Sequence, residues 1–171
     1  MLKPAVLYKE ELERKFAECL YSEEYFLYAG YATCNELPKI EAKDNSYQWA
    51  AVDGEGVVGY FAYQIQPETD TALNFGLYSF DKGNPVVGLD VYGKMKELIL
   101  GHRRIEWRMI GGNPAKTAYD KLCGRYGGNC VRLHQVTRDA AGVWRDEYIY
   151  EIWRGGESGM VRGKNGNQGR D

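Results

Sequence analysis

The sequence lacks the features that mark several common classes of protein. None of its 171 residues belongs to an apolar run near the roughly 20 residues that a membrane-spanning helix needs. The amino-terminal stretch, MLKPAVLYKEELERK, has no apolar core of the kind that a signal peptide carries. We therefore expect a cytoplasmic protein that does not bind membranes.

Histidine and cysteine are too few and too scattered to indicate a metal site. The chain has two histidines and four cysteines, and no two cysteines have the close spacing of zinc ligands. No GxSxG turn is present, which argues against a Ser-His-Asp hydrolase. A cysteine nucleophile would need Cys123 or Cys130 to lie beside His134, and proximity along the chain does not establish that. We expect no metal, and thiols that are reduced and mostly buried.

An excess of charge of one sign is also missing. The 22 basic and 24 acidic residues give a net charge of −2, which argues against a general nucleic-acid binder. Residues 154–171 differ from the rest, since they hold six glycines and carry four basic against two acidic residues. We predict one domain over residues 1–153 and a mobile, Gly-rich tail over residues 154–171. Contact between this tail and RNA is a weaker alternative.

The body of the chain alternates between strand and helix patterns. Strand patterns cover residues 4–8, 47–53, 57–66, 72–80, 103–110, 130–139 and 143–153, and helical patterns cover residues 9–28, 85–100 and 114–126. The order β-α-ββ-β-α-β-α-ββ predicts an α/β fold with a mixed sheet. The sheet should be parallel at its centre and antiparallel in the hairpins at its flanks.

The tripeptide GNP occurs twice, each time between a predicted strand and a predicted helix. Asn84 and Asn113 suit the N-cap, and the proline after each suits the first helical position. Helices that follow adjacent parallel strands begin at the same edge of a sheet. Open α/β sheets bind ligands at that edge, and helix N-termini favour phosphate. The two turns therefore predict one ligand-binding edge.

The first of these turns, DKGNPVVG, offers a lysine and glycines to a diphosphate. This turn matches neither GxGxxG nor GxxxxGK[ST], which argues against a Rossmann dinucleotide enzyme and against a nucleotide triphosphatase.

Three segments resemble the GNAT superfamily of N-acetyltransferases. They are LNFGLYSF with the turn after it, IEWRMIGGNP, and AKTAYDKLCGRYGG, and the order of elements extends the resemblance over residues 4–153. YQWAAVD, NFGLYSFDKGNP and DEYIYEI are similar, more narrowly, to small GNAT-like proteins of gut Firmicutes and their phages. The resemblance implies a GNAT-like acyl-CoA N-acyltransferase fold, whose central parallel strands splay apart to form a cleft for acetyl-CoA.

The resemblance also implies a set of cofactor-binding residues. The backbone of residues 77–80 would bind the pantetheine arm, N–H groups of residues 82–88 the diphosphate, and Asn113 a further part of the cofactor. Where the family's signature reads Gln/Arg-x-x-Gly-x-Gly/Ala, this chain has Gly83 in place of Gln/Arg and Val86 in place of the first Gly. The implied acetyl-CoA contacts are Leu77, Tyr78, Ser79, Phe80, Lys82, Gly83, Asn84, Val87, Gly88 and Asn113.

Acetyl transfer needs an oxyanion donor, an acid and a base. The resemblance assigns the acid role to Tyr119, which can instead simply pack beside Tyr126 on one helical face. A backbone N–H of Tyr78 or Ser79 is the candidate oxyanion donor. Glu106 is the candidate base, although it can instead pair with a neighbouring arginine, and deprotonation through water stays open.

The leading hypothesis is an acetyl-CoA-dependent N-acetyltransferase acting on an amine of a small molecule, peptide or protein. The alternative is a degenerate GNAT domain that is not catalytic and binds CoA or a protein partner. The late strands offer an edge through which a homodimer can form.

Overall fold

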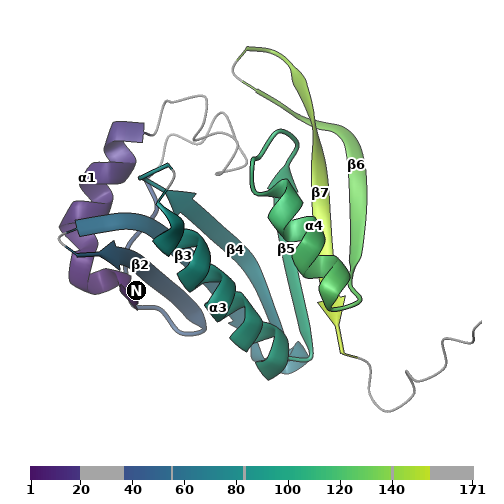
Figure 1. Cartoon of the computed structure of the whole chain (residues 1–171), viewed down its shortest axis with the longest axis horizontal. Helices are drawn as coiled ribbons and strands as arrows, with labels where there is room; N and C mark the ends of the chain where they lie inside the picture. Colours follow the sequence, from purple (N-terminus) through teal and green to yellow (C-terminus); the bar gives the residue numbers. More distant parts are fainter. Residues whose placement is uncertain (20–36, 55, 83, 140, 155–171) are drawn as a thin grey trace, which may run out of the picture.

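The computed structural model describes residues 1–19, 37–54, 56–82, 84–139 and 141–154, which form a seven-stranded sheet with three α-helices (Figure 1). The strand order is β1-β2-β3-β4-β5-β7-β6. The strands are β1 (Leu2–Pro4), β2 (Ser46–Asp53), β3 (Gly56–Gln66), β4 (Thr71–Ser79), β5 (Arg104–Ile110), β6 (Asn129–Arg138) and β7 (Trp144–Trp153). The helices are α1 (Lys9–Cys19), α3 (Pro85–Gly101) and α4 (Lys116–Arg125), with short 3₁₀ helices at Ala5–Tyr8 and Pro67–Thr69.

The sheet is mixed, as predicted. β4 and β5 pair in parallel, and the five other pairings between strands are antiparallel. Both predicted hairpins form, β2 with β3 and β6 with β7. Gly54 and Gly142 lie in these two turns with φ of 51° and 82°, a left-handed conformation that glycine adopts without steric penalty.

The first predicted strand is wrong. β1 ends at Pro4, and the next four residues form a 3₁₀ helix. Burial explains the difference: Ala5 is buried, but Val6 and Leu7 are 52% and 72% exposed, which is not the alternation of a strand against a core. The segment instead turns the chain into α1. The rest of the helix predicted for residues 9–28 lies outside the described residues, as does the tail from residue 155.

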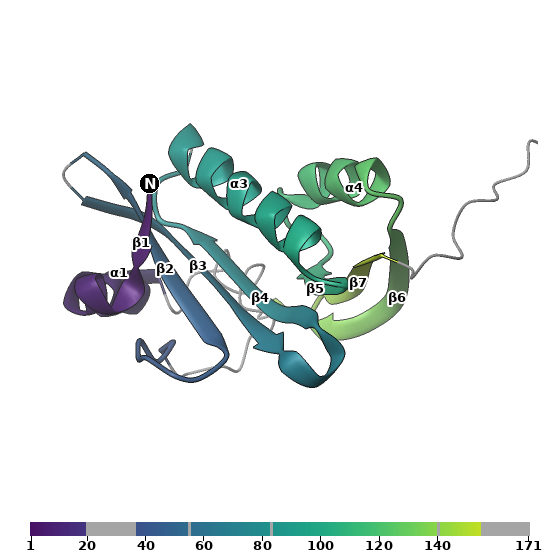
Figure 2. The same ribbon diagram turned by 90° about the horizontal axis from the view of Figure 1, so that it is seen from below.

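The helices cover the sheet on both faces. α3 and α4 lie on one face and α1 lies on the other (Figure 2). The larger core lies between the sheet and α3 and α4, and includes Phe61, Val87, Val91, Met95, Leu98, Ile99, Ile105, Trp107, Met109, Leu122, Tyr150 and Ile152. The smaller core beneath α1 includes Leu12, Phe16, Ile40, Tyr60 and Tyr78. Within the described ranges, no helix is long and apolar enough to cross a membrane.

β5 alternates as the sequence predicts. Ile105, Trp107 and Met109 are buried in the larger core, and Glu106 and Arg108 lie on the opposite face. The indole of Trp107 stacks on Tyr150 of β7, with ring centroids 5.0 Å apart and an interplanar angle of 5°. An aromatic pair of this kind contributes roughly 0.5–1.5 kcal/mol beyond the area it buries. The stack therefore ties β5 firmly to β7.

Gly128 gives a test of packing at the end of α4. A Cβ there would lie 2.7 Å from Cys123 Sγ and 2.8 Å from Ile152 Cγ1, and closer still to the carbonyl oxygen of Glu151. We expect Gly128→Ala to lower the free energy of unfolding by about 1–3 kcal/mol through overpacking. Gly93→Ala is the control, because its Cβ meets open space within α3 and alanine favours a helix by about 1 kcal/mol. Denaturant unfolding measures both changes, and equal stability of the two variants would contradict the prediction.

Candidate active site

The centre of the site is the gap where β4 and β5 separate. Their parallel ladder consists of Thr71 paired with Arg104 and Ala72 paired with Ile105. Both described strands continue beyond these pairs, β4 to Ser79 and β5 to Ile110, without pairing with each other. Figure 1 shows them diverging from a common end. Beyond the ladder, the backbone groups along the two facing edges are open to another partner.

A β-bulge in β4 accompanies this separation. One residue of β3, Tyr63, lies opposite two residues of β4, Asn74 and Phe75. Asn74 has a φ of 54°, a left-handed conformation that asparagine tolerates better than most residues. Its amide nitrogen donates to Gln64 Oε1 at 2.8 Å. A bulge bends its own strand and increases the local twist, so β4 turns away from β5 after the bulge.

Asp70 fastens the closed end of the gap. Its Oδ2 accepts the backbone N–H of Arg103 at 2.8 Å, and its Oδ1 lies 2.8 Å from His102 Nδ1. Its carbonyl accepts the N–H of Arg104 at 3.2 Å. The hydrogen bond with His102, followed by that with Arg103, holds the pKa of the Asp70 carboxyl below its usual value. These bonds join the start of β4 to the start of β5.

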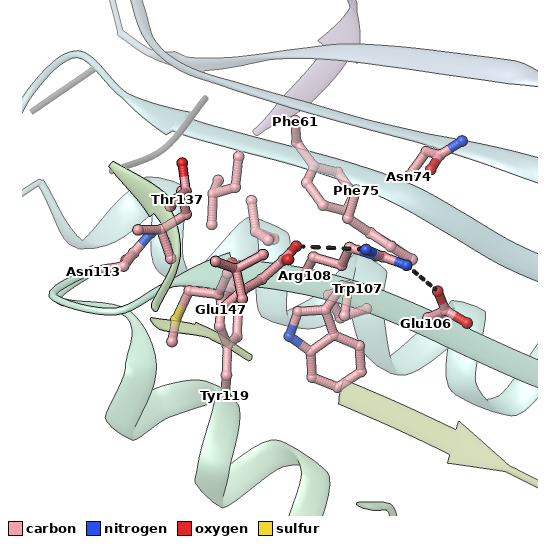
Figure 3. A pocket seen from close by; sticks show the side chains of 16 residues that line it. Phe61, Asn74, Phe75, Glu106, Trp107, Arg108, Asn113, Tyr119, Thr137 and Glu147 are labelled. Atoms are coloured by element: carbon pink, nitrogen blue, oxygen red, sulfur yellow. Dashed lines mark ion pairs between the residues drawn. The ribbon is translucent and has the colours of Figure 1, made fainter. Parts of the chain in front are cut away.

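A cavity of about 430 Å³ occupies the gap, a size in the range of small-molecule sites. Side chains from both faces of β5 line it, so the cavity passes between the strands through the plane of the sheet (Figure 3). The lining residues are Phe61, Asn74, Phe75, Leu77, Val91, Met95, Glu106, Trp107, Arg108, Met109, Ile110, Asn113, Tyr119, Val136, Thr137 and Glu147.

Tyr119 of α4 lies on the aromatic side of the cavity. Its ring meets those of Trp107 and Tyr150 edge-on, with centroids 5.8 and 5.9 Å away. The hydroxyl of Tyr150 donates to Asp120 Oδ1 at 2.7 Å, which joins β7 to α4 beside Tyr119. Burial and the hydrogen bond with Asp120 both raise the pKa of Tyr150, so this hydroxyl stays protonated. Tyr119 thus packs in the core, as its structural alternative predicts, and also lines the cavity.

A chain of ion pairs runs across the opposite face of β5 and β7. Arg104 forms ion pairs with Glu151 at 2.6 Å and with Glu106 at 2.8 Å. Arg108 forms longer ion pairs, with Glu106 at 4.0 Å and with Glu147 at 3.6 Å. The pairing foreseen as the alternative role of Glu106 therefore occurs. All five side chains are partly exposed, and such pairs each contribute about 0–1 kcal/mol. Glu106, Arg108 and Glu147 line the cavity on this side (Figure 3).

Glu147 and the bulge at Asn74 are the parts of the site that sequence reasoning missed. The alternation in β7 carried a signal for Glu147, because Tyr150 and Ile152 share the core face and Glu147 belongs to the other. Its position at the cavity also depends on the pairing of Glu147 with Ile110 of β5, which no local pattern indicates.

The second GNP turn brings Asn113 to the cavity. Asn113 Oδ1 accepts the N–H of Ala115 at 2.8 Å, and its carbonyl accepts the N–H of Lys116 at 3.1 Å. α4 begins at Lys116 and not at Pro114, the predicted start, because Pro114 and Ala115 form a separate turn before the helix. The prediction that Asn113 is the N-cap of this helix is therefore wrong, because Ala115 is the N-cap residue and the side chain of Asn113 caps the turn ahead of the helix.

The predicted cofactor-binding residues divide between the cavity and the turn before α3. Leu77 and Asn113 line the cavity, and both predicted catalytic residues, Glu106 and Tyr119, line it too. Gly83 lies outside the described residues. The other predicted residues do not line the cavity and lie in the stretch from the end of β4 to the start of α3. They are Tyr78, Ser79, Phe80, Lys82, Asn84, Val87 and Gly88.

The backbone of β4 presents alternate residues to the open edge. The N–H of Phe80 donates to the carbonyl of Val58 in β3 at 2.9 Å. In an antiparallel ladder, residues two apart point their N–H groups to the same side. The N–H of Tyr78 therefore also faces β3, and those of Leu77 and Ser79 face the gap.

The described fold is that of known N-acetyltransferases. No protein-family model matches the chain, and no curated protein matches its sequence. The solved structures that are similar to the chain include the following three. Protein smu.2055 of Streptococcus mutans has a TM-score of 0.60 at 18% identity, covering 90% of this chain and 98% of its own. An N-acetyltransferase of Staphylococcus aureus has a TM-score of 0.59 at 14% identity, covering 90% and 97%. The ribosomal-protein-S18-alanine N-acetyltransferase of Escherichia coli has a TM-score of 0.57 at 14% identity, covering 92% and 97%. The predicted GNAT-like fold is confirmed.

The Asp70 contacts give a testable pH dependence. The pKa of Asp70 is lowered in the folded state. Its contribution to the free energy of unfolding is therefore complete above the ordinary aspartate pKa of about 3.9, and is lost as the pH falls through the folded-state pKa. We expect Asp70→Asn to be less stable than the parent protein at about pH 5, where the Asp70 carboxylate is ionised, with the difference shrinking below about pH 4. Denaturant unfolding across this range measures it. A difference that stays constant down to pH 3 would contradict the assignment.

Proposed function

We propose that this protein is an N-acetyltransferase that moves an acetyl group from acetyl-CoA to an amine. The observation that carries the proposal is the cavity between β4 and β5, which passes through the sheet and is lined differently on its two sides. An acyl transfer needs two substrates to meet at one point, and a passage of this kind lets them approach from opposite faces. The N-acetyltransferases that share the fold support the same activity.

The cleft suits the thioester-bearing arm of acetyl-CoA. When bound, acetyl-CoA supplies an activated acetyl group. The open edge of β4 offers the N–H groups of Leu77 and Ser79 to the amides of the pantetheine arm, in the manner of an added strand. Apolar side chains of Phe61, Val91 and Met95 line the cavity beside this edge. The turn before α3 suits the diphosphate poorly, because the N–H groups of Asn84 and Val86 are bonded within the protein and Pro85 has none.

One side chain can assist the transfer on the aromatic side. Neither candidate oxyanion donor is assigned the role, because the N–H of Tyr78 faces β3 and that of Ser79 is offered to the pantetheine arm. The phenol of Tyr119 lies at the cavity, so its O–H can donate the proton that the leaving sulfur needs. Packing against Trp107 and Tyr150 restricts the ring of Tyr119 to one orientation.

The charged side of the cavity is the proposed acceptor side. Glu106 is the candidate base, and it lies near the closed end of the gap between two guanidinium groups. Its carboxylate oxygens are engaged by Arg104 and Arg108, and deprotonation of the amine through a bound water is the other route. Glu147 lines the same side and pairs with Arg108. Carboxylates at this mouth favour a cationic acceptor, a small-molecule amine or a peptide or protein amine.

The alternative is a non-catalytic module with the same fold. The turn before α3 favours it, since this turn departs from the family's diphosphate signature and engages its own donors. The two functions differ in a simple property, because the catalytic one requires the cleft to hold a thioester.

Tyr119→Phe tests the proposed function. We expect turnover to fall at least about tenfold, since the acid is lost, while the affinity for acetyl-CoA stays within about twofold because the ring packing is kept. Release of free thiol with a panel of amines measures turnover, and calorimetry measures the Kd. Tyr126→Phe is the matched control, because Tyr126 packs against the same core without lining the cavity, and its turnover should not change. If the parent protein bound neither acetyl-CoA nor CoA at millimolar concentration, the non-catalytic alternative would replace the proposal.

A further inference from the structure

The turn between β4 and α3 is closed by contacts of its own side chains. Asn84 Oδ1 accepts the N–H of Val86 at 2.9 Å, and Asn84 Nδ2 donates to Asp53 Oδ2 at 2.9 Å and to Asp81 Oδ2 at 3.3 Å. The backbone N–H of Asn84 donates to the carbonyl of Asp81 at 3.2 Å. One asparagine therefore joins the β2–β3 hairpin, the end of β4 and the start of α3.

These contacts use two of the donors that a diphosphate would need. A helix N-terminus binds phosphate through the N–H groups of its first turn. At this helix, Pro85 has no N–H, Val86 is capped by Asn84, and the N–H of Asn84 is bonded within the turn. The side chain of Val87 packs closely over Gly59, where an added Cβ would lie 2.9 Å from both of its methyl carbons.

The charges at this turn are unfavourable for a diphosphate as well. The carboxylates of Asp53 and Asp81 both point at Asn84, directly beside the start of α3. Lys82 is one positive charge on the same turn against two negative ones. A phosphate group brought to this position would meet like charges where the fold's usual cofactor needs donors.

The cleft offers the opposite chemistry. Leu77 and Ser79 turn backbone groups toward the gap, and aromatic and aliphatic side chains line it. A pantetheine arm has two amide groups along an otherwise apolar chain, so it matches an open strand edge beside apolar walls. The two parts of the CoA molecule thus meet very different surfaces in this protein.

We infer that the protein recognises its acyl donor through the S-acyl-pantetheine arm and gains little affinity from the nucleotide. Donors that carry this arm without the adenosine diphosphate portion are therefore substrates of the same kind. The C–S bond of the thioester breaks, a C–N bond forms to a neutral amine, and the amine proton ends on the pantetheine thiol. This inference rests on the proposed function and specifies its donor.

The test compares binding of pantetheine, 4′-phosphopantetheine and CoA to the full chain by calorimetry. We expect the Kd of pantetheine to lie within about tenfold of that of CoA, because the turn before α3 should contribute little affinity for the nucleotide. A Kd for pantetheine more than tenfold weaker than that of CoA would overturn the inference and leave the proposed function standing. Absence of binding by all three ligands would overturn the proposed function itself.

A charge variant makes the test specific to the turn. Asp81→Asn removes one carboxylate but keeps an oxygen that can accept from Asn84. We expect it to tighten CoA binding by about two- to fivefold, in the range of an exposed charge interaction, and to leave pantetheine binding unchanged. Asp44→Asn, an exposed aspartate at the opposite end of β2, is the control and should change neither Kd. An equal response of CoA and pantetheine to Asp81→Asn would overturn the inference.

Discussion

One extra residue in β4 is the constraint on which the rest of the site depends. A regular parallel ladder between β4 and β5 would fill the gap with backbone hydrogen bonds and leave no cavity. Asn74 in the left-handed region and the bulge it forms with Phe75 turn β4 aside after two pairs. The Asp70 contacts keep the other end closed. The result is an opening of fixed position in an otherwise continuous sheet. Backbone groups on its two unpaired strand edges can form hydrogen bonds with a ligand.

The two sides of this opening differ because β5 alternates strictly. Its core face places Trp107 against Tyr150 and Tyr119, where burial fixes the rings. Its other face carries Glu106 and Arg108 within a chain of ion pairs that stays partly exposed. Neighbouring residues of one strand thus give the cavity a rigid aromatic wall and an adjustable charged wall. This division suits the proposed transfer, in which a thioester arm lies along the strand edge and a cationic amine enters over the carboxylates.

Much of this arrangement follows from local patterns in the sequence. The hairpins, the parallel centre, the start of α3 and the faces of β5 were predictable because glycine turns, helix caps and alternation act over a few residues. Positions that depend on distant contacts were not. Residues 5–8 form a 3₁₀ helix in which Ala5 is buried and the next two side chains are exposed. Glu147 reaches the cavity only through its pairing with β5. The Asn84 turn was identified as a cap, but its contact with Asp53 of another hairpin has no local signal.

The most direct test of the account is to locate the bound thioester on the sheet. Backbone amide shifts of the ¹⁵N-labelled protein, followed while acetyl-CoA is added, report which N–H groups meet the ligand. The account predicts that the largest changes fall on the open edge of β4 at Leu77 and Ser79 and on β5, with small changes at Tyr78 and Phe80, whose N–H groups face β3. Changes confined to other surfaces, or no changes at millimolar acetyl-CoA, would contradict it.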